Sequence, residues 1–210
     1  GDLGRERARR VGVGNAHRRL ADGAHLQVLL VQRHQHLGCA GAGDIEIAVL
    51  LEVEEVTGGW NRIIEVAERT EAAVEANLAT PCARNARALY VTALAAAYAG
   101  DEGAARRYER RAEEVATEGY DVVLAAPRTW LALLRGRMDE VDRLARIDLA
   151  RIPHEYALPA AAAQLDAFAA LGERSSVERY APPLLQTGTY LEPFALRALG
   201  SAREDALLIE

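Results

Sequence analysis

The chain has 210 residues and a formal net charge of −6, with 50% hydrophobic and only 5% aromatic residues. This length can bury a core, and a composition dominated by Ala, Leu and Val favours packed helices over a β-sandwich. The negative charge argues against a general nucleic-acid coat protein, and no uncharged apolar run of about 18 residues predicts a membrane span. All 25 basic residues are arginine, which indicates a GC-rich bacterial gene. With two cysteines and no signal peptide, we expect a cytoplasmic protein.

Residues 1–43 differ in composition from the rest of the chain. They contain eight of the 17 glycines and four of the five histidines, and seven arginines against three acidic residues give them a net charge of +4. The remaining residues, 44–210, therefore carry −10. We predict that 1–43 is a basic, poorly structured arm, and its composition raises the hypothesis that it is translated from the wrong reading frame. The second domain, 44–210, is predicted to be a helical-repeat domain.

Capping residues and apolar stripes predict the first helices of the repeat domain. Asp44 can cap a helix that ends at Thr57-Gly58-Gly59. The acidic residues of this helix, and two others further on, are expected on solvated faces rather than as catalytic pairs: Glu52, Glu54, Glu55, Glu113 and Glu114. A second helix is predicted over 60–78. Thr80-Pro81 then marks the start of a third, alanine-rich helix over 82–98.

The clearest helical hairpin is centred on Gly100. Glycine is favoured where a helix ends in the left-handed conformation, and Asp101 can cap the helix that follows. Similar turns are predicted at Gly136 and Gly172, so the three glycines are separated by 36 residues each time. A fixed period of this length predicts stacked helix pairs that bury their apolar faces against their neighbours. The predicted fold class is therefore all-α, built from stacked antiparallel helix pairs.

The remaining helices follow the same scheme. They are predicted over 120–135, 137–147, 156–171 and 173–181, with Pro127 as a possible kink in the first. Pro182-Pro183 ends the last of them, and a short helix is predicted from Pro193 to Leu199. Ser201 can cap a final helix that reaches Glu210.

Two resemblances extend this interpretation. The hairpin at Gly100 resembles a tetratricopeptide repeat, because its small-residue positions are matched by Ala93, Ala105 and Ala112; Ala96 and Glu109 stand where that family has aromatic residues. This resemblance implies a right-handed α-solenoid over roughly 60–186. The stretches 77–102 and 188–210 resemble the C-terminal helical region of large bacterial proteins that carry a class III nucleotide cyclase or regulatory ATPase domain. The second resemblance implies that 44–210 is a fragment of such a protein, used for sensing or protein contact.

No residue pattern predicts catalysis, a cofactor or a metal. The best metal candidate is His34, His36 and Cys39, but a glycine-rich arm gives them no firm frame, so a solvated arm is the favoured interpretation. A glycine-rich phosphate loop with a following lysine is missing, since the chain has no lysine. We therefore predict that the protein is not an enzyme.

The predicted function is a non-catalytic module that contacts another protein or another domain of its parent chain. A small-molecule sensor domain and the remnant of a multidomain enzyme are the alternatives. Arg84, Asn85 and Arg87 lie on the helix expected to line the concave face, and with Trp130 they are the predicted partner contacts. Neither a membrane nor a nucleic acid is expected as a partner, and the sequence leaves the identity of the partner, the signal and the oligomeric state open.

Overall fold

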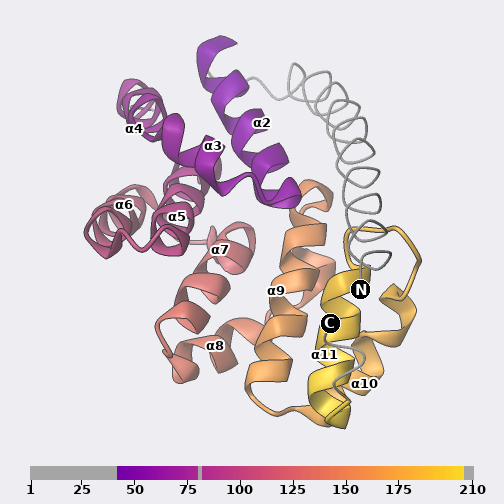
Figure 1. Cartoon of the computed structure of the whole chain (residues 1–210). Helices are drawn as coiled ribbons and strands as arrows, with labels where there is room; N and C mark the ends of the chain where they lie inside the picture. Colours follow the sequence, from indigo (N-terminus) through magenta and orange to yellow (C-terminus); the bar gives the residue numbers. More distant parts are fainter. Residues whose placement is uncertain (1–41, 80–81, 206–210) are drawn as a thin grey trace, which may run out of the picture.

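The computed structural model describes residues 42–79 and 82–205. Within these ranges the chain forms ten α-helices, three short 3₁₀-helices and no strand, which confirms the predicted all-α class (Figure 1). Residues 1–41 of the predicted arm lie outside the described residues, as do the metal candidates His34, His36 and Cys39.

The first described helix, α2, spans Ala42–Thr57, so Asp44 lies inside it rather than at the predicted start. Its end agrees with the prediction. Gly58 adopts φ +75°, and the Gly59 amide donates a hydrogen bond of 2.8 Å to the Glu54 carbonyl. The left-handed glycine lets the chain turn sharply away from the helix.

The single helix predicted over 60–78 is wrong. The structure has two helices, α3 (Trp60–Glu65) and α4 (Ala67–Ala76), separated at Val66, whose φ and ψ are −103° and 7°. Both Ile63 and Val66 are buried and share an apolar cluster with Leu51 of α2 and Val91 of α5. The Val66 amide donates to the carbonyl of Ile63, three residues earlier, at 3.3 Å, so α3 ends in a tight turn while both residues stay in the cluster.

The hairpin predicted at Gly100 is confirmed. Helices α5 (Ala83–Tyr98) and α6 (Glu102–Val115) are joined by Gly100 at φ +80°. The Asp101 amide donates to the Ala96 carbonyl at 2.9 Å, and the Asp101 carboxylate accepts from the Ala104 amide at 2.9 Å. One residue pair thus ends α5 and begins α6.

The same backbone turn recurs at Gly136 and Gly172, where φ is +64° and +68°. The first joins α7 (Asp121–Leu134) to α8 (Met138–Ala145), and the second joins α9 (Ala157–Ala170) to α10 (Arg174–Tyr180). The residue after each glycine donates its amide to the carbonyl five residues earlier, at 2.9 Å in both turns. Pro127 lies inside α7. Three 3₁₀-helices cover Leu149–Arg151, His154–Tyr156 and Pro182–Leu184.

The last helix, α11, spans Glu192–Arg203 and passes through Ser201, so the predicted separate helix beginning at Ser201 is wrong. The helix ends at Glu204, whose φ is 55°, and the Asp205 amide donates to the Gly200 carbonyl at 2.9 Å. A left-handed residue therefore ends this helix as glycine ends the earlier ones. Residues 206–210 lie outside the described ranges.

Helices α5, α7, α9 and α11 pack side by side in that order, and α6, α8 and α10 each contact the helix that precedes them (Figure 1). Many residues in these contacts are alanines with no exposed surface, such as Ala93, Ala105, Ala162 and Ala167. Small side chains allow the helices to approach closely and leave little room for gaps. Helix α2 packs against α3, α4 and α5 and also touches α9.

Candidate functional site

A buried ion pair holds α2 against α5. Arg87 donates from Nη2 to Oε2 of Glu55 at 2.6 Å, and the exposed fractions of the two side chains are 3% and 0%. The Arg87 guanidinium also lies 4.5 Å from the centre of the Tyr156 ring, a favourable cation–π distance. This cluster therefore joins α2 and α5 to the short helix that precedes α9.

The burial of this cluster away from water changes the pKa values of its groups. Burial raises the pKa of Glu55 above its ordinary value, and this effect outweighs the attraction of Arg87. Burial alone would lower the pKa of Arg87, but the charges of Glu55 and its neighbours raise it. Burial also raises the pKa of Tyr156 to about 12. Oε1 of Glu55 and Nε of Arg87 are buried without a hydrogen-bond partner, so the pair satisfies only part of its bonding capacity.

A small pocket lies beside the ion pair. It has a free volume of about 10 Å³ and is lined by Ala48, Leu51, Glu52, Arg84, Arg87, Ala88 and Tyr156. Arg84 reaches into the same region, with its Nε 3.5 Å from the Tyr156 hydroxyl. The volume is enough for about one water molecule, whereas drug-sized ligands occupy pockets of roughly 300–1,000 Å³. In this form the pocket does not hold a metabolite.

The predicted partner contacts fall into two groups. Arg84 and Asn85 are half-buried, and their role as partner contacts stays a prediction. Arg87 and Trp130 are buried, with exposed fractions of 3% and 6%, so they are not accessible surface residues in this structure. The physical reason is that each has a polar partner on another helix. Arg87 pairs with Glu55, and Trp130 donates from Nε1 to Asp166 at 3.0 Å.

The expectation that the carboxylates of α2 face solvent is wrong for two of them. Glu55 and Glu52 are 3% and 8% exposed. Glu54 is half-buried, while Glu113 and Glu114 of α6 are exposed as predicted. An ionised carboxylate is stable in the interior only when it is paired, and Arg87 supplies the pair for Glu55.

A second cluster joins α7, α9 and α11. Asp166 accepts from Trp130 and also from Nη2 of Arg197 at 2.5 Å. The Arg197 guanidinium lies 5.1 Å from the centre of the Phe194 ring, and the rings of Phe194 and Trp130 are 6.4 Å apart. Asp166 thus fixes Trp130 and Arg197, and the side chain of Arg197, which is 48% exposed, lies over Phe194.

Two large apolar side chains are exposed near the ends of α5 and α7. Tyr98 and Leu134 are 45% and 49% exposed, and each lies two residues before the glycine that ends its helix. Burial raises the pKa of Tyr98, Asp166 raises it further, and Arg197 lowers it, so Tyr98 lies within electrostatic reach of both charges. We call Tyr98, Leu134, Asp166 and Arg197 the Tyr98 surface. The sequence pattern did not single out these four residues as a site, although the shared position of Tyr98 and Leu134 before Gly100 and Gly136 was a usable signal.

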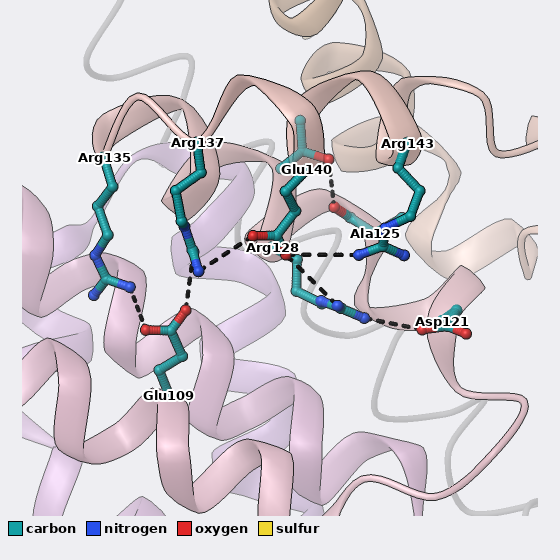
Figure 2. Close-up of polar contacts among 9 residues, drawn as sticks. Glu109, Asp121, Ala125, Arg128, Arg135, Arg137, Glu140 and Arg143 are labelled. Atoms are coloured by element: carbon teal, nitrogen blue, oxygen red, sulfur yellow. Dashed lines mark hydrogen bonds and ion pairs between the residues drawn. The ribbon is translucent and has the colours of Figure 1, made fainter.

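A network of ion pairs connects α6, α7 and α8 around the turn at Gly136 (Figure 2). Glu109, which is 9% exposed, accepts from Arg135 and, at 3.0 Å, from Arg137. Glu140 pairs with Arg137, Arg128 and Arg143 at 3.2, 3.6 and 3.7 Å. Figure 2 shows these arginines converging on the two carboxylates. The network explains how a charged residue is accommodated at position 109, where the tetratricopeptide pattern has an aromatic residue.

The described residues contain no group of three or more His, Cys, Asp or Glu that could hold a metal ion. No helix in the described ranges is long and apolar enough to cross a membrane. Comparisons with protein-family models, with curated proteins and with solved structures found no match to this chain. Both resemblances noted in the sequence therefore stay predictions.

Proposed function

We propose that this chain is a non-catalytic helical-repeat module of stacked antiparallel helix pairs that contacts another protein or another domain of its parent chain. The support for a repeat is the 36-residue spacing, which appears in contacts as well as in the glycines. Trp130 bonds to Asp166, 36 residues later, and Arg107 and Arg111 of α6 pair with Glu71 and Glu75 of α4, each 36 residues earlier. Stacked repeats make contacts of this kind between equivalent positions.

The Tyr98 surface is the observation that carries the proposed contact. Tyr98 and Leu134 are exposed at equivalent positions of neighbouring hairpins, and Tyr98 lies within electrostatic reach of Arg197, which is fixed by Asp166. Tyrosine and arginine are among the residues that contribute most to binding energy at protein interfaces. Exposed apolar side chains that are grouped, rather than scattered singly, mark interaction sites.

The wider role follows from the second resemblance. The module would belong to a larger cytoplasmic bacterial signalling or regulatory protein, with an ATPase or nucleotide cyclase as its output domain. Binding at the Tyr98 surface would bias that domain because the partner prefers one of its states. The pocket beside Arg84 gives no specific support to a small-molecule sensor, since it has room for about one water molecule.

Site-specific cross-linking tests the contact. A photoreactive phenylalanine analogue would replace Tyr98 in one chain and, as a matched control, Leu158 of α9 in another, since Leu158 is 43% exposed. We expect one defined cross-linked partner from the native cell at position 98 and none at position 158. Adding Leu134→Ala should reduce recovery about tenfold, which corresponds to about 1.4 kcal/mol. Equal cross-linking at both positions would show that the Tyr98 surface is not the contact.

A further inference from the structure

We propose that the part of α5 that now holds α2 is a receptor site for an acidic amphipathic helix of a partner protein, which binds there by displacing α2. This inference rests on the proposed function and deepens it, because it names a second contact surface and the chemistry of its partner. The Tyr98 surface does not include α2, so the two proposals can fail separately.

Helix α2, which occupies the site, shows which side chains the site accepts. Glu52 and Glu55 are three residues apart and therefore share one face of α2. Glu55 bonds to Arg87, and Glu52 lines the pocket together with Arg84 and Arg87. Leu51, the residue before Glu52, supplies apolar contact and is 2% exposed. A helix that fits this site needs two carboxylates three residues apart and an apolar stripe beside them.

Helix α2 fills this site imperfectly. Oε1 of Glu55 and Nε of Arg87 are buried without hydrogen-bond partners, and a buried ion pair whose bonds are incomplete costs more to desolvate than it regains. The adjoining pocket is lined on α2 and α5 by two short side chains, Ala48 and Ala88, among others. A partner helix with a larger residue opposite Ala88, and a polar group that reaches the free Nε, would make better contacts than α2.

Helix α2 takes no part in the repeated turns. Helix α2 is joined to α3 by a short turn at Gly58, and it belongs to none of the hairpins centred on Gly100, Gly136 and Gly172. Its departure would expose Arg87 together with apolar residues such as Val91 of α5. A positively charged and apolar surface accepts an acidic amphipathic helix and disfavours a basic one.

The test uses a disulfide that locks α2 in place. Ala48→Cys and Ala88→Cys place one thiol on α2 and one on α5, both at residues that line the pocket. The full-length chain also carries Cys39→Ser and Cys82→Ser, which remove its two native thiols. The probe is a fluorescent peptide with the sequence of residues 42–57. Because the tethered α2 competes at an effective concentration of roughly millimolar, the chain also carries Glu55→Ala, which leaves Arg87 for the peptide to pair with. Fluorescence anisotropy measures binding with the disulfide oxidised and reduced.

We expect the reduced chain to bind the peptide at least about tenfold more tightly than the oxidised chain. A peptide carrying Glu55→Gln should lose about tenfold in affinity for the reduced chain, because it offers no charge to Arg87. Circular dichroism checks that each chain is folded. If Glu55→Ala loses its helical signal, the measurement is made with Glu55→Gln, which keeps the shape of the side chain.

Three outcomes would overturn the proposal. Equal binding to the oxidised and reduced chains would show that the peptide binds elsewhere. A reduced chain that is folded but binds no peptide at concentrations up to about 1 mM has no receptor site for such a helix. A reduced chain that forms a dimer in light scattering without peptide would show that the occupant is a second copy. None of these results alters the cross-linking expected at position 98.

Discussion

Removing one charge of the Glu55–Arg87 pair should destabilise the protein far more than removing both. Arg87→Met leaves the carboxylate of Glu55 unpaired at an exposed fraction of 0%, and breaking a buried pair in this way costs about 3–5 kcal/mol. For a domain of this size, each kcal/mol shifts the Tm by roughly 2–4 °C, so the Tm should fall by about 6–20 °C. The double variant Glu55→Leu/Arg87→Met should be neutral or up to about 4 kcal/mol more stable than the wild type.

Urea unfolding followed by circular dichroism gives the four free energies of the double-mutant cycle. The matched control is the pair Arg62–Glu65, which has the same N–O distance of 2.6 Å but side chains that are 57% and 59% exposed. Solvent screening should limit the coupling there to about 1 kcal/mol or less. If Arg87→Met lowers the free energy of unfolding no more than Arg62→Met does, the charge of Glu55 is solvated despite its burial, and the prediction is wrong.

The pH dependence of Arg87→Met follows from the direction of the Glu55 shift. The pKa of Glu55 is already raised above 4.5 by burial, and loss of Arg87 removes the main effect that lowers it. A raised pKa means that the native state favours the protonated carboxyl. The stability contributed by this group is therefore fully present below its unfolded pKa and is lost as pH rises through the native pKa. The deficit of Arg87→Met should be smallest below about pH 4.5, the ordinary pKa of the group, and should grow as the pH rises above it. A deficit independent of pH would show that it arises from packing.

Two further predictions use matched substitutions. Gly100→Ala should cost about 1–2 kcal/mol because φ is +80°; no atom lies within 4 Å of the added methyl, so the cost is one of backbone conformation alone. Gly103→Ala in α6 should gain about 0.4–1 kcal/mol, and thermal shifts of the same sign would contradict the assigned turn. Asp166→Ala should cost about 1–3 kcal/mol by leaving the Trp130 indole N–H buried without an acceptor, while Asp166→Asn keeps the acceptor and should cost less. Equal losses in urea unfolding would show that the hydrogen bond to Trp130 does not contribute.

The hairpin turns could be predicted because their causes are local. A left-handed φ is costly for any residue except glycine, so Gly100, Gly136 and Gly172 mark their turns whatever surrounds them. The break at Val66 could not be predicted in this way, since φ −103° and ψ 7° do not demand a particular residue. Ile63 and Val66 pack in a cluster with residues from helices before and after them in the sequence, and the pattern of one helix does not show that cluster.

The buried charges were missed for a related reason. Charged residues on amphipathic helices are almost always solvated, so Glu55 and Arg87 were assigned to surfaces. Their burial depends on a partner 32 residues away, and the periodicity of one helix does not show which other helix it meets. One signal was present. Arg87 stands between Ala86 and Ala88 in a helix whose other buried residues are almost all apolar, where an unpaired charge would not be tolerated.

The two proposed surfaces lie toward opposite ends of α5. Arg87 and Tyr98 are separated by 11 residues of one helix, which places their backbones about 16 Å apart at 1.5 Å per residue. Sites separated by more than about 7–10 Å usually act independently unless a shared element moves. A partner helix that displaces α2 therefore need not touch Tyr98. Two routes connect the surfaces. Helix α5 pairs with Glu55 at one end and carries Tyr98 at the other, and α3 follows α2 directly and places Trp60 4.9 Å from the Tyr98 ring. Any coupling between the two partners would then show that α5 or α3 shifts when α2 leaves.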